Sequence, residues 1–122
     1  MMLTIAAGLI FALGAAHSYL GERYLLSRLL RRDNLPKLLG GTDFTKQTLR
    51  FAWHVTTVAW WGFAILLLQA ERGELSATTA VSVIGWTAIA SALLPLVITR
   101  GRHLSWIVML AIGALALSWQ AP

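Results

Sequence analysis

The sequence contains no cysteine among its 122 residues. This absence excludes disulfide bonds, c-type haem attachment, iron–sulfur clusters and thiol nucleophiles. Charge is also scarce, because only 12% of the residues are Asp, Glu, Lys or Arg, whereas 57% are hydrophobic. A water-soluble domain of this size needs a more polar surface, so the composition excludes one and indicates a membrane protein.

The few charged residues leave four long uncharged runs, which are residues 1–21, 51–70, 75–99 and 103–122. Each can cross a bilayer, because about 20 helical residues rising ~1.5 Å each cover a hydrocarbon core of ~30 Å. We therefore predict an all-α membrane protein with a single transmembrane domain over residues 1–122, an antiparallel bundle of four helices. The predicted spans are residues 2–21, 48–70, 76–98 and 102–119, with a basic extension and loop over residues 22–47.

The basic residues predict how these spans are oriented. Residues 21–50 hold seven Lys and Arg, the connection at 71–74 holds one beside two Glu, and the connection at 100–102 holds two. Because basic residues stay on the cytoplasmic side, this predicts both termini outside the cytoplasmic (inner) membrane of a bacterium. The first run has no basic residue before it, which argues against a cleavable signal peptide. Because the net charge of +5 lies beside the spans, we expect anionic lipid headgroups as partners and not nucleic acid.

The connections predict how the helices pair. Leucines and arginines at helical spacing follow Glu22, so the first helix is expected to continue into the headgroup region and to end near Pro36. Gly40 and Gly41 predict a turn, and the side chains over residues 42–45 are candidate N-caps of the next helix. The two later connections are short, so the last three helices should pack in sequence while the first closes the bundle.

Trp86 falls in the middle of the third predicted span. Its indole N–H needs a hydrogen-bond partner at a depth without water. We expect Ser82 or a neighbouring helix to supply that partner.

Three histidines are predicted to lie near one level at the cytoplasmic side, because His17 ends the first span, His54 begins the second and His103 begins the fourth. Gly14 and Gly21 flank His17 on one helix face, which lets another helix or a flat ligand approach the imidazole. Glu22, five residues after His17, is not expected on that face.

A polar stripe runs inward on the second span through Arg50, His54, Thr57 and Trp61. Together with His17 and His103 these residues form a candidate ligand pocket facing the cytoplasm. The three imidazoles are candidate ligands for a transition metal or for haem b, or donors to a quinone-like or anionic ligand beside the arginine. The alternative is that each histidine donates to a carbonyl or hydroxyl group of a neighbouring helix.

Two stretches, AAHSYLGERYLL (residues 15–26) and RFAWHVTTVAWWG (residues 50–62), resemble segments of small uncharacterised bacterial four-helix inner-membrane proteins. The resemblance implies a fold and a location, and it implies no activity.

Three classes of function remain open. The first is a small-ligand-binding or accessory subunit, either as a homo-oligomer or within a larger membrane complex. The second is a haem- or metal-binding redox protein that uses the histidines, and the third is a small transporter or channel that acts as an oligomer. Catalysis is disfavoured, because the uncharged runs contain no carboxylate to orient a base.

Overall fold

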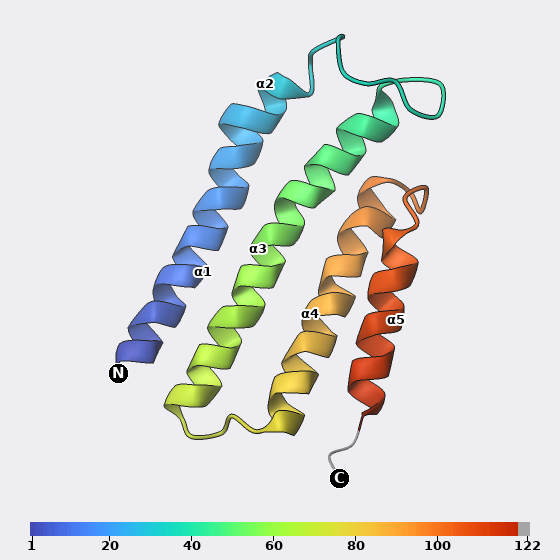
Figure 1. Ribbon diagram of the computed structural model, residues 1–122. Helices are drawn as coiled ribbons and strands as arrows, with labels where there is room; N and C mark the ends of the chain where they lie inside the picture. Colours follow the sequence, from blue (N-terminus) through green and yellow to red (C-terminus); the bar gives the residue numbers. More distant parts are fainter. Residues whose placement is uncertain (120–122) are drawn as a thin grey trace.

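The computed structural model describes residues 1–119, which form helices joined by turns and one longer loop (Figure 1). The elements are α1 (Met2–Leu20), the π-helix η1 (Gly21–Leu26), α2 (Ser27–Leu29), α3 (Asp43–Glu71), α4 (Ala77–Ile98) and α5 (Ser105–Ser118). The first three follow one another without a break, so Met2–Leu29 forms one continuous rod. The described residues include no strand, and the prediction of an all-helical protein is confirmed.

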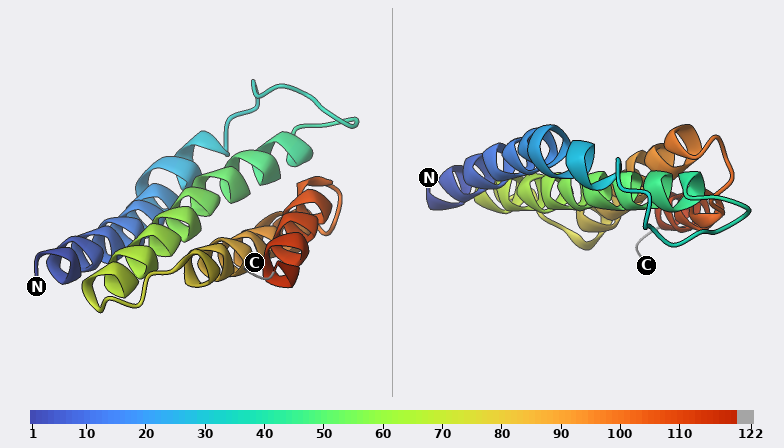
Figure 2. Two further views of the ribbon diagram at one scale, coloured as in Figure 1. Left: turned by 60° about the horizontal axis from the view of Figure 1, so that its bottom comes forward. Right: turned by 90° about the horizontal axis from the view of Figure 1, so that it is seen from above.

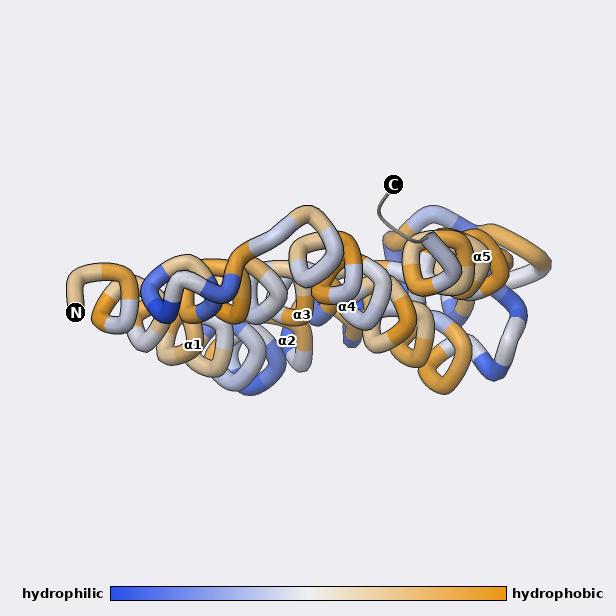
Figure 3. The backbone as a smooth tube through the Cα atoms, turned by 90° about the horizontal axis from the view of Figure 1, so that it is seen from below, coloured by the Kyte–Doolittle hydropathy of each residue, from blue (hydrophilic) through white to orange (hydrophobic). Residues whose placement is uncertain are grey.

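The long helices lie side by side in one row, in the order α1, α3, α4, α5 (Figures 1 and 2). Each packs on its neighbour in that order, and within the described residues α1 contacts neither α4 nor α5. Seen from below, α1 and α5 lie at opposite edges of the row (Figure 3). The expected closure of a bundle by the first helix is therefore not found. The physical reason is that lipid tails are as apolar as leucine, so burying more apolar surface between helices offers no hydrophobic gain in a membrane.

Three helices are long and apolar enough to cross a membrane, namely Met2–Leu29, Asp43–Glu71 and Ala77–Ile98. The fourth predicted span, residues 102–119, is shorter than expected, because α5 has only 14 residues. These rise about 21 Å at 1.5 Å per residue, which is less than a hydrocarbon core of ~30 Å. The helix begins late because a turn occupies the residues before Ser105, with Arg100 and Gly101 at positive φ of 53° and 77°.

The first helix continues past the uncharged run, as predicted, but it ends at Leu29 and not near Pro36. Its last part is unusual, because η1 over Gly21–Leu26 replaces the α-helical hydrogen bonding there with the wider π pattern. Each such stretch shifts the register of the residues that follow it around the helix axis. Glu22 lies within this stretch.

The turns between helices agree with their residues. Gly40 has a φ of 89° in the predicted glycine turn, and Thr42 takes the N-cap position of α3 without a side-chain hydrogen bond to it. Ser76 caps α4 in a reciprocal pair with Thr79. At the opposite end of α1 from η1, the carboxylate of Glu71 accepts a hydrogen bond from the Leu3 backbone N–H at 2.9 Å, which suits the positive end of a helix.

Candidate functional site

The contact between α1 and α3 is built around two glycines of the first helix. A Cβ atom added at Gly14 would lie 2.6 Å from the indole nitrogen of Trp61, and one added at Gly21 would lie 2.5 Å from Cε2 of Trp53. Glycine therefore leaves the space into which each indole packs, so the two backbones approach closely at both levels. The small-residue face of the first helix receives α3 and not a flat ligand.

Three side chains of α3 donate hydrogen bonds to backbone carbonyl oxygens of α1. The bonds run from Trp61 Nε1 to Phe11 O at 3.3 Å, from Thr57 Oγ1 to Gly14 O at 3.2 Å and from Trp53 Nε1 to His17 O at 3.0 Å. The acceptors are spaced by three residues along one face of α1 and the donors by four along α3. Each donor has an acceptor on the neighbouring helix, so these bonds fix the register of the two antiparallel helices.

A second set of polar contacts joins the same helices nearer the basic loop. Arg50 Nη2 lies 2.9 Å from Glu22 Oε1, and His54 Nε2 lies 3.2 Å from Glu22 Oε2. His54 Nδ1 lies 2.8 Å from the hydroxyl of Ser18, which is itself 2.7 Å from the hydroxyl of Thr57. The Nε2–H of His54 donates to the carboxylate, and Nδ1 shares a hydrogen bond with the Ser18 hydroxyl. The polar stripe of α3 is thus engaged by α1.

His17 is enclosed by two tryptophans of α3. Its ring stacks on Trp53 with the ring centroids 4.3 Å apart and the planes 4° apart, and its centroid lies 5.0 Å from that of Trp60. His17 Nε2 donates to the Trp53 carbonyl oxygen at 3.2 Å. The Trp53 ring therefore covers a face of His17, and the Trp53 backbone carbonyl engages Nε2, one of the two nitrogens that a haem or metal site could use.

His103 lies apart from this contact. Its ring stacks on Phe44 with centroids 5.5 Å apart and meets the Phe51 ring edge-on at 4.8 Å, so it packs against the start of α3. Within residues 1–119, no group of three or more His, Asp or Glu side chains is placed to hold a metal ion. The structure therefore does not gather His17, His54 and His103 into the three-histidine site considered from the sequence.

Ser18 and Glu22 are site residues that the sequence analysis does not identify. They lie four residues apart on the first helix, as Arg50 and His54 do on α3. Two polar stripes of the same spacing pair naturally when the helices run antiparallel, which is the signal that could have found them. Glu22 contacts a histidine of the neighbouring helix, His54, and not His17 of its own helix.

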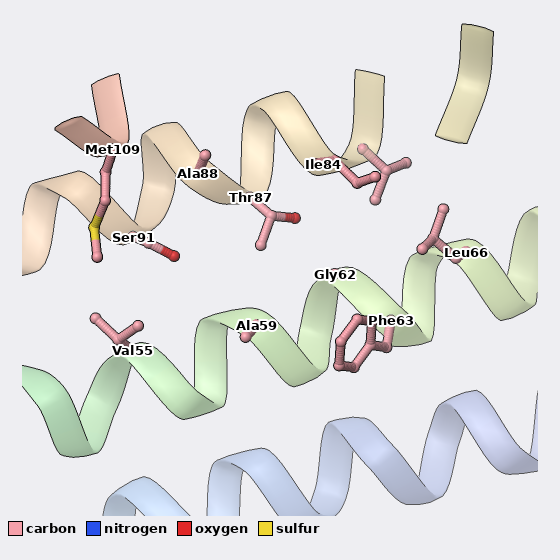
Figure 4. Close-up of a pocket in the computed structure, with 11 residues that line it drawn as sticks. Val55, Ala59, Gly62, Phe63, Leu66, Ile84, Thr87, Ala88, Ser91 and Met109 are labelled. Carbon is pink, nitrogen blue, oxygen red and sulfur yellow. The ribbon is translucent and has the colours of Figure 1, made fainter. Parts of the chain in front are cut away.

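Two open grooves follow the contact between α3 and α4, one on each side of Gly62. The helices touch there, since a Cβ atom added at Gly62 would lie 2.5 Å from the hydroxyl of Thr87. The first groove, of about 280 Å³, is almost wholly apolar and reaches from Val55 and Met109 to Leu66 (Figure 4). The second groove, of about 430 Å³, lies on the other side of Gly62, and its lining includes Trp61, Gln69 and Trp86. Of the predicted pocket residues, only Trp61 lines either groove.

Comparison of the chain with known protein families, with curated proteins and with solved structures found no match.

Proposed function

We propose that this protein is an accessory subunit of the bacterial cytoplasmic membrane, which acts by packing against other membrane components and not by catalysis. The proposal rests on the α1–α3 contact, where Arg50, His54, Thr57 and Trp61 are engaged by the neighbouring helix. Polar groups that hold two helices in register are not free to form hydrogen bonds with a diffusible ligand. Their chemistry is that of interhelical polar contacts in a membrane.

The row of helices supports the same function. A single layer leaves both of its broad faces open to lipid or to another protein, and its helices carry exposed apolar side chains such as Leu9, Phe63, Leu93 and Leu115. A second copy of the chain or a larger membrane complex would be the partner. Because the row follows chain order, its free edges belong to α1 and α5.

In this proposal both termini are exported and the basic segment over residues 22–47 contacts anionic headgroups at the cytoplasmic surface. The short helix α5 then crosses the bilayer with local thinning of the hydrocarbon core, at a modest cost per ångström of mismatch.

The redox alternative, with haem b or a transition metal on the histidines, is less well supported. His17 is stacked on Trp53, and His103 packs on Phe44. A transporter or channel acting as an oligomer is the other alternative, and it would need a polar path between chains.

Extraction of the full chain in mild detergent tests the proposal. Native mass spectrometry should find the chain in an assembly of defined stoichiometry, and a visible spectrum with metal analysis should find no haem or metal at one equivalent per chain. A monomer that carries one equivalent of haem or metal would overturn the accessory role and favour the redox alternative. A monomer that carries neither haem nor metal would also overturn the accessory role.

A further inference from the structure

The second groove of the α3–α4 contact differs from the first in its chemistry. Two tryptophans line it, Trp61 from α3 and Trp86 from α4, together with the amide side chain of Gln69 and the hydroxyls of Ser82 and Thr87. Its volume is about 430 Å³. Aromatic faces and polar groups in one open groove suit a ligand that is itself both flat and polar at its edge.

Most polar groups of this groove lack hydrogen-bond partners within residues 1–119, whereas the indole N–H of Trp61 donates to Phe11 O. The Oε1 atom of Gln69 is buried and has no hydrogen-bond partner within residues 1–119. Trp86 is 63% exposed, and in the described part of the chain no hydrogen bond engages its indole N–H or the hydroxyls of Ser82 and Thr87. The partner predicted for Trp86, either Ser82 or a neighbouring helix, is thus not found in the described residues.

The groove runs from the middle of the spanning helices towards the α3–α4 turn. Trp61 precedes Glu71, the last residue of α3, by ten positions, and Trp86 follows Ala77, the first residue of α4, by nine. Both tryptophans therefore lie about 15 Å from the end of their helix at ~1.5 Å per residue, near the middle of the hydrocarbon core. At that depth neither water nor an acyl chain bonds the Trp86 indole N–H. Gln69 lies two positions before Glu71, about 3 Å from the end of α3, at the shallow end of the groove.

We propose that this groove binds a lipid-soluble ring that carries carbonyl or hydroxyl oxygens, the chemistry of a quinone–quinol pair. The ring would lie against the tryptophans, with one oxygen accepting from the Trp86 indole N–H and the opposite oxygen bonded to the Gln69 amide. The amide NH2 donates to that oxygen in the quinone form, and Oε1 accepts from its hydroxyl in the quinol form. An acyl chain fills the first groove equally well but leaves the polar groups of the second groove unsatisfied. The inference goes beyond the accessory role and does not depend on it.

The test uses the full chain in lipid nanodiscs with a short-tailed benzoquinone as the probe, followed by quenching of tryptophan fluorescence. We expect saturable binding at one quinone per chain. Trp86→Phe and Gln69→Leu should each weaken it about tenfold, because each removes one buried hydrogen bond to the ring. Trp106→Phe and Gln47→Leu are the matched controls, since Trp106 donates to Gly101 O and Gln47 lies at the other end of α3, outside the groove.

The alternatives give different results. Quenching that never saturates and is equal in all variants would mean that the quinone only dissolves in the bilayer. Saturable binding that is unchanged in Trp86→Phe and Gln69→Leu would place the ligand elsewhere. Displacement of the quinone by an equimolar alkane of the same tail length would make the groove an acyl-chain site. Each of these outcomes overturns the proposal, and none of them bears on the oligomeric assembly measured for the accessory role.

Discussion

Replacing Gly21 by alanine tests the α1–α3 contact most directly. The new methyl group would lie 2.5 Å from Cε2 and 2.8 Å from Cζ2 of Trp53, so the indole would have to move. Its movement would break the hydrogen bond to His17 O, worth about 0.6 kcal/mol in a membrane, and the stacked pair with His17, worth about 1 kcal/mol. Overpacking adds about 1 kcal/mol or more. We expect the free energy of unfolding to fall by about 2–3 kcal/mol.

Gly8→Ala is the matched control, because no atom lies within 4 Å of a Cβ added there. It should leave stability unchanged or raise it by up to about 1 kcal/mol through helix propensity. The assay is unfolding of the purified chain by sodium dodecyl sulfate in mixed micelles, followed by circular dichroism. In a Trp53→Ala background, Gly21→Ala should cost almost nothing, because the residue it displaces is gone. Equal stabilities of Gly21→Ala and Gly8→Ala would refute the close packing described for these helices.

Three further predictions concern the same contact and the orientation of the chain. Thr57→Val should lower the free energy of unfolding by about 1–2 kcal/mol, because Thr57 is 4% exposed and bonded to α1. Glu22→Gln should lower it by less than about 1 kcal/mol in the same assay, because the ion pair of Glu22 with Arg50 is partly exposed, and a larger loss for Glu22→Gln than for Thr57→Val would contradict these roles. Cysteines placed at Ser18 and Thr57, whose hydroxyl oxygens are 2.7 Å apart, should crosslink with a short reagent in native membranes on a background free of other cysteines, and failure to crosslink would separate the two helices. A reporter active only in the cytoplasm should give a signal when inserted at Gly40 and none at Gly73, and the opposite pattern would invert the topology.

The sequence predicts the helices of this protein better than it predicts their arrangement. Uncharged runs mark the parts of a helix that can lie in lipid. A helix continues beyond such a run wherever the backbone of the charged residues that follow keeps its helical hydrogen bonds. For this reason α3 begins at Asp43 and not at residue 48, and the first helix runs on to Leu29. The row of helices has no local signal, because it depends on the absence of a hydrophobic gain from closing a bundle.

The candidate site shows the same division. The polar stripe with Arg50, His54 and Thr57 could be read from spacing, and it does lie on the face of α3 that meets α1. The matching spacing of Ser18 and Glu22 marks them as candidate partners, but spacing alone does not show that they meet the stripe, because they do so only in one register of two antiparallel helices. That register depends on Gly14 and Gly21 accepting indoles of the other helix, a fit in three dimensions that no pattern along one helix contains.

The order of the row has a consequence for how the protein is made. Within the described residues, each long helix contacts only the long helices next to it in chain order. Each interface can therefore form as soon as the ribosome has synthesised the second of its two helices. A nascent chain that has emerged as far as Arg72 already contains every residue of the α1–α3 contact described above. The pair could therefore dock while α4 is still being synthesised, and each later helix would add to the free edge of what is already folded.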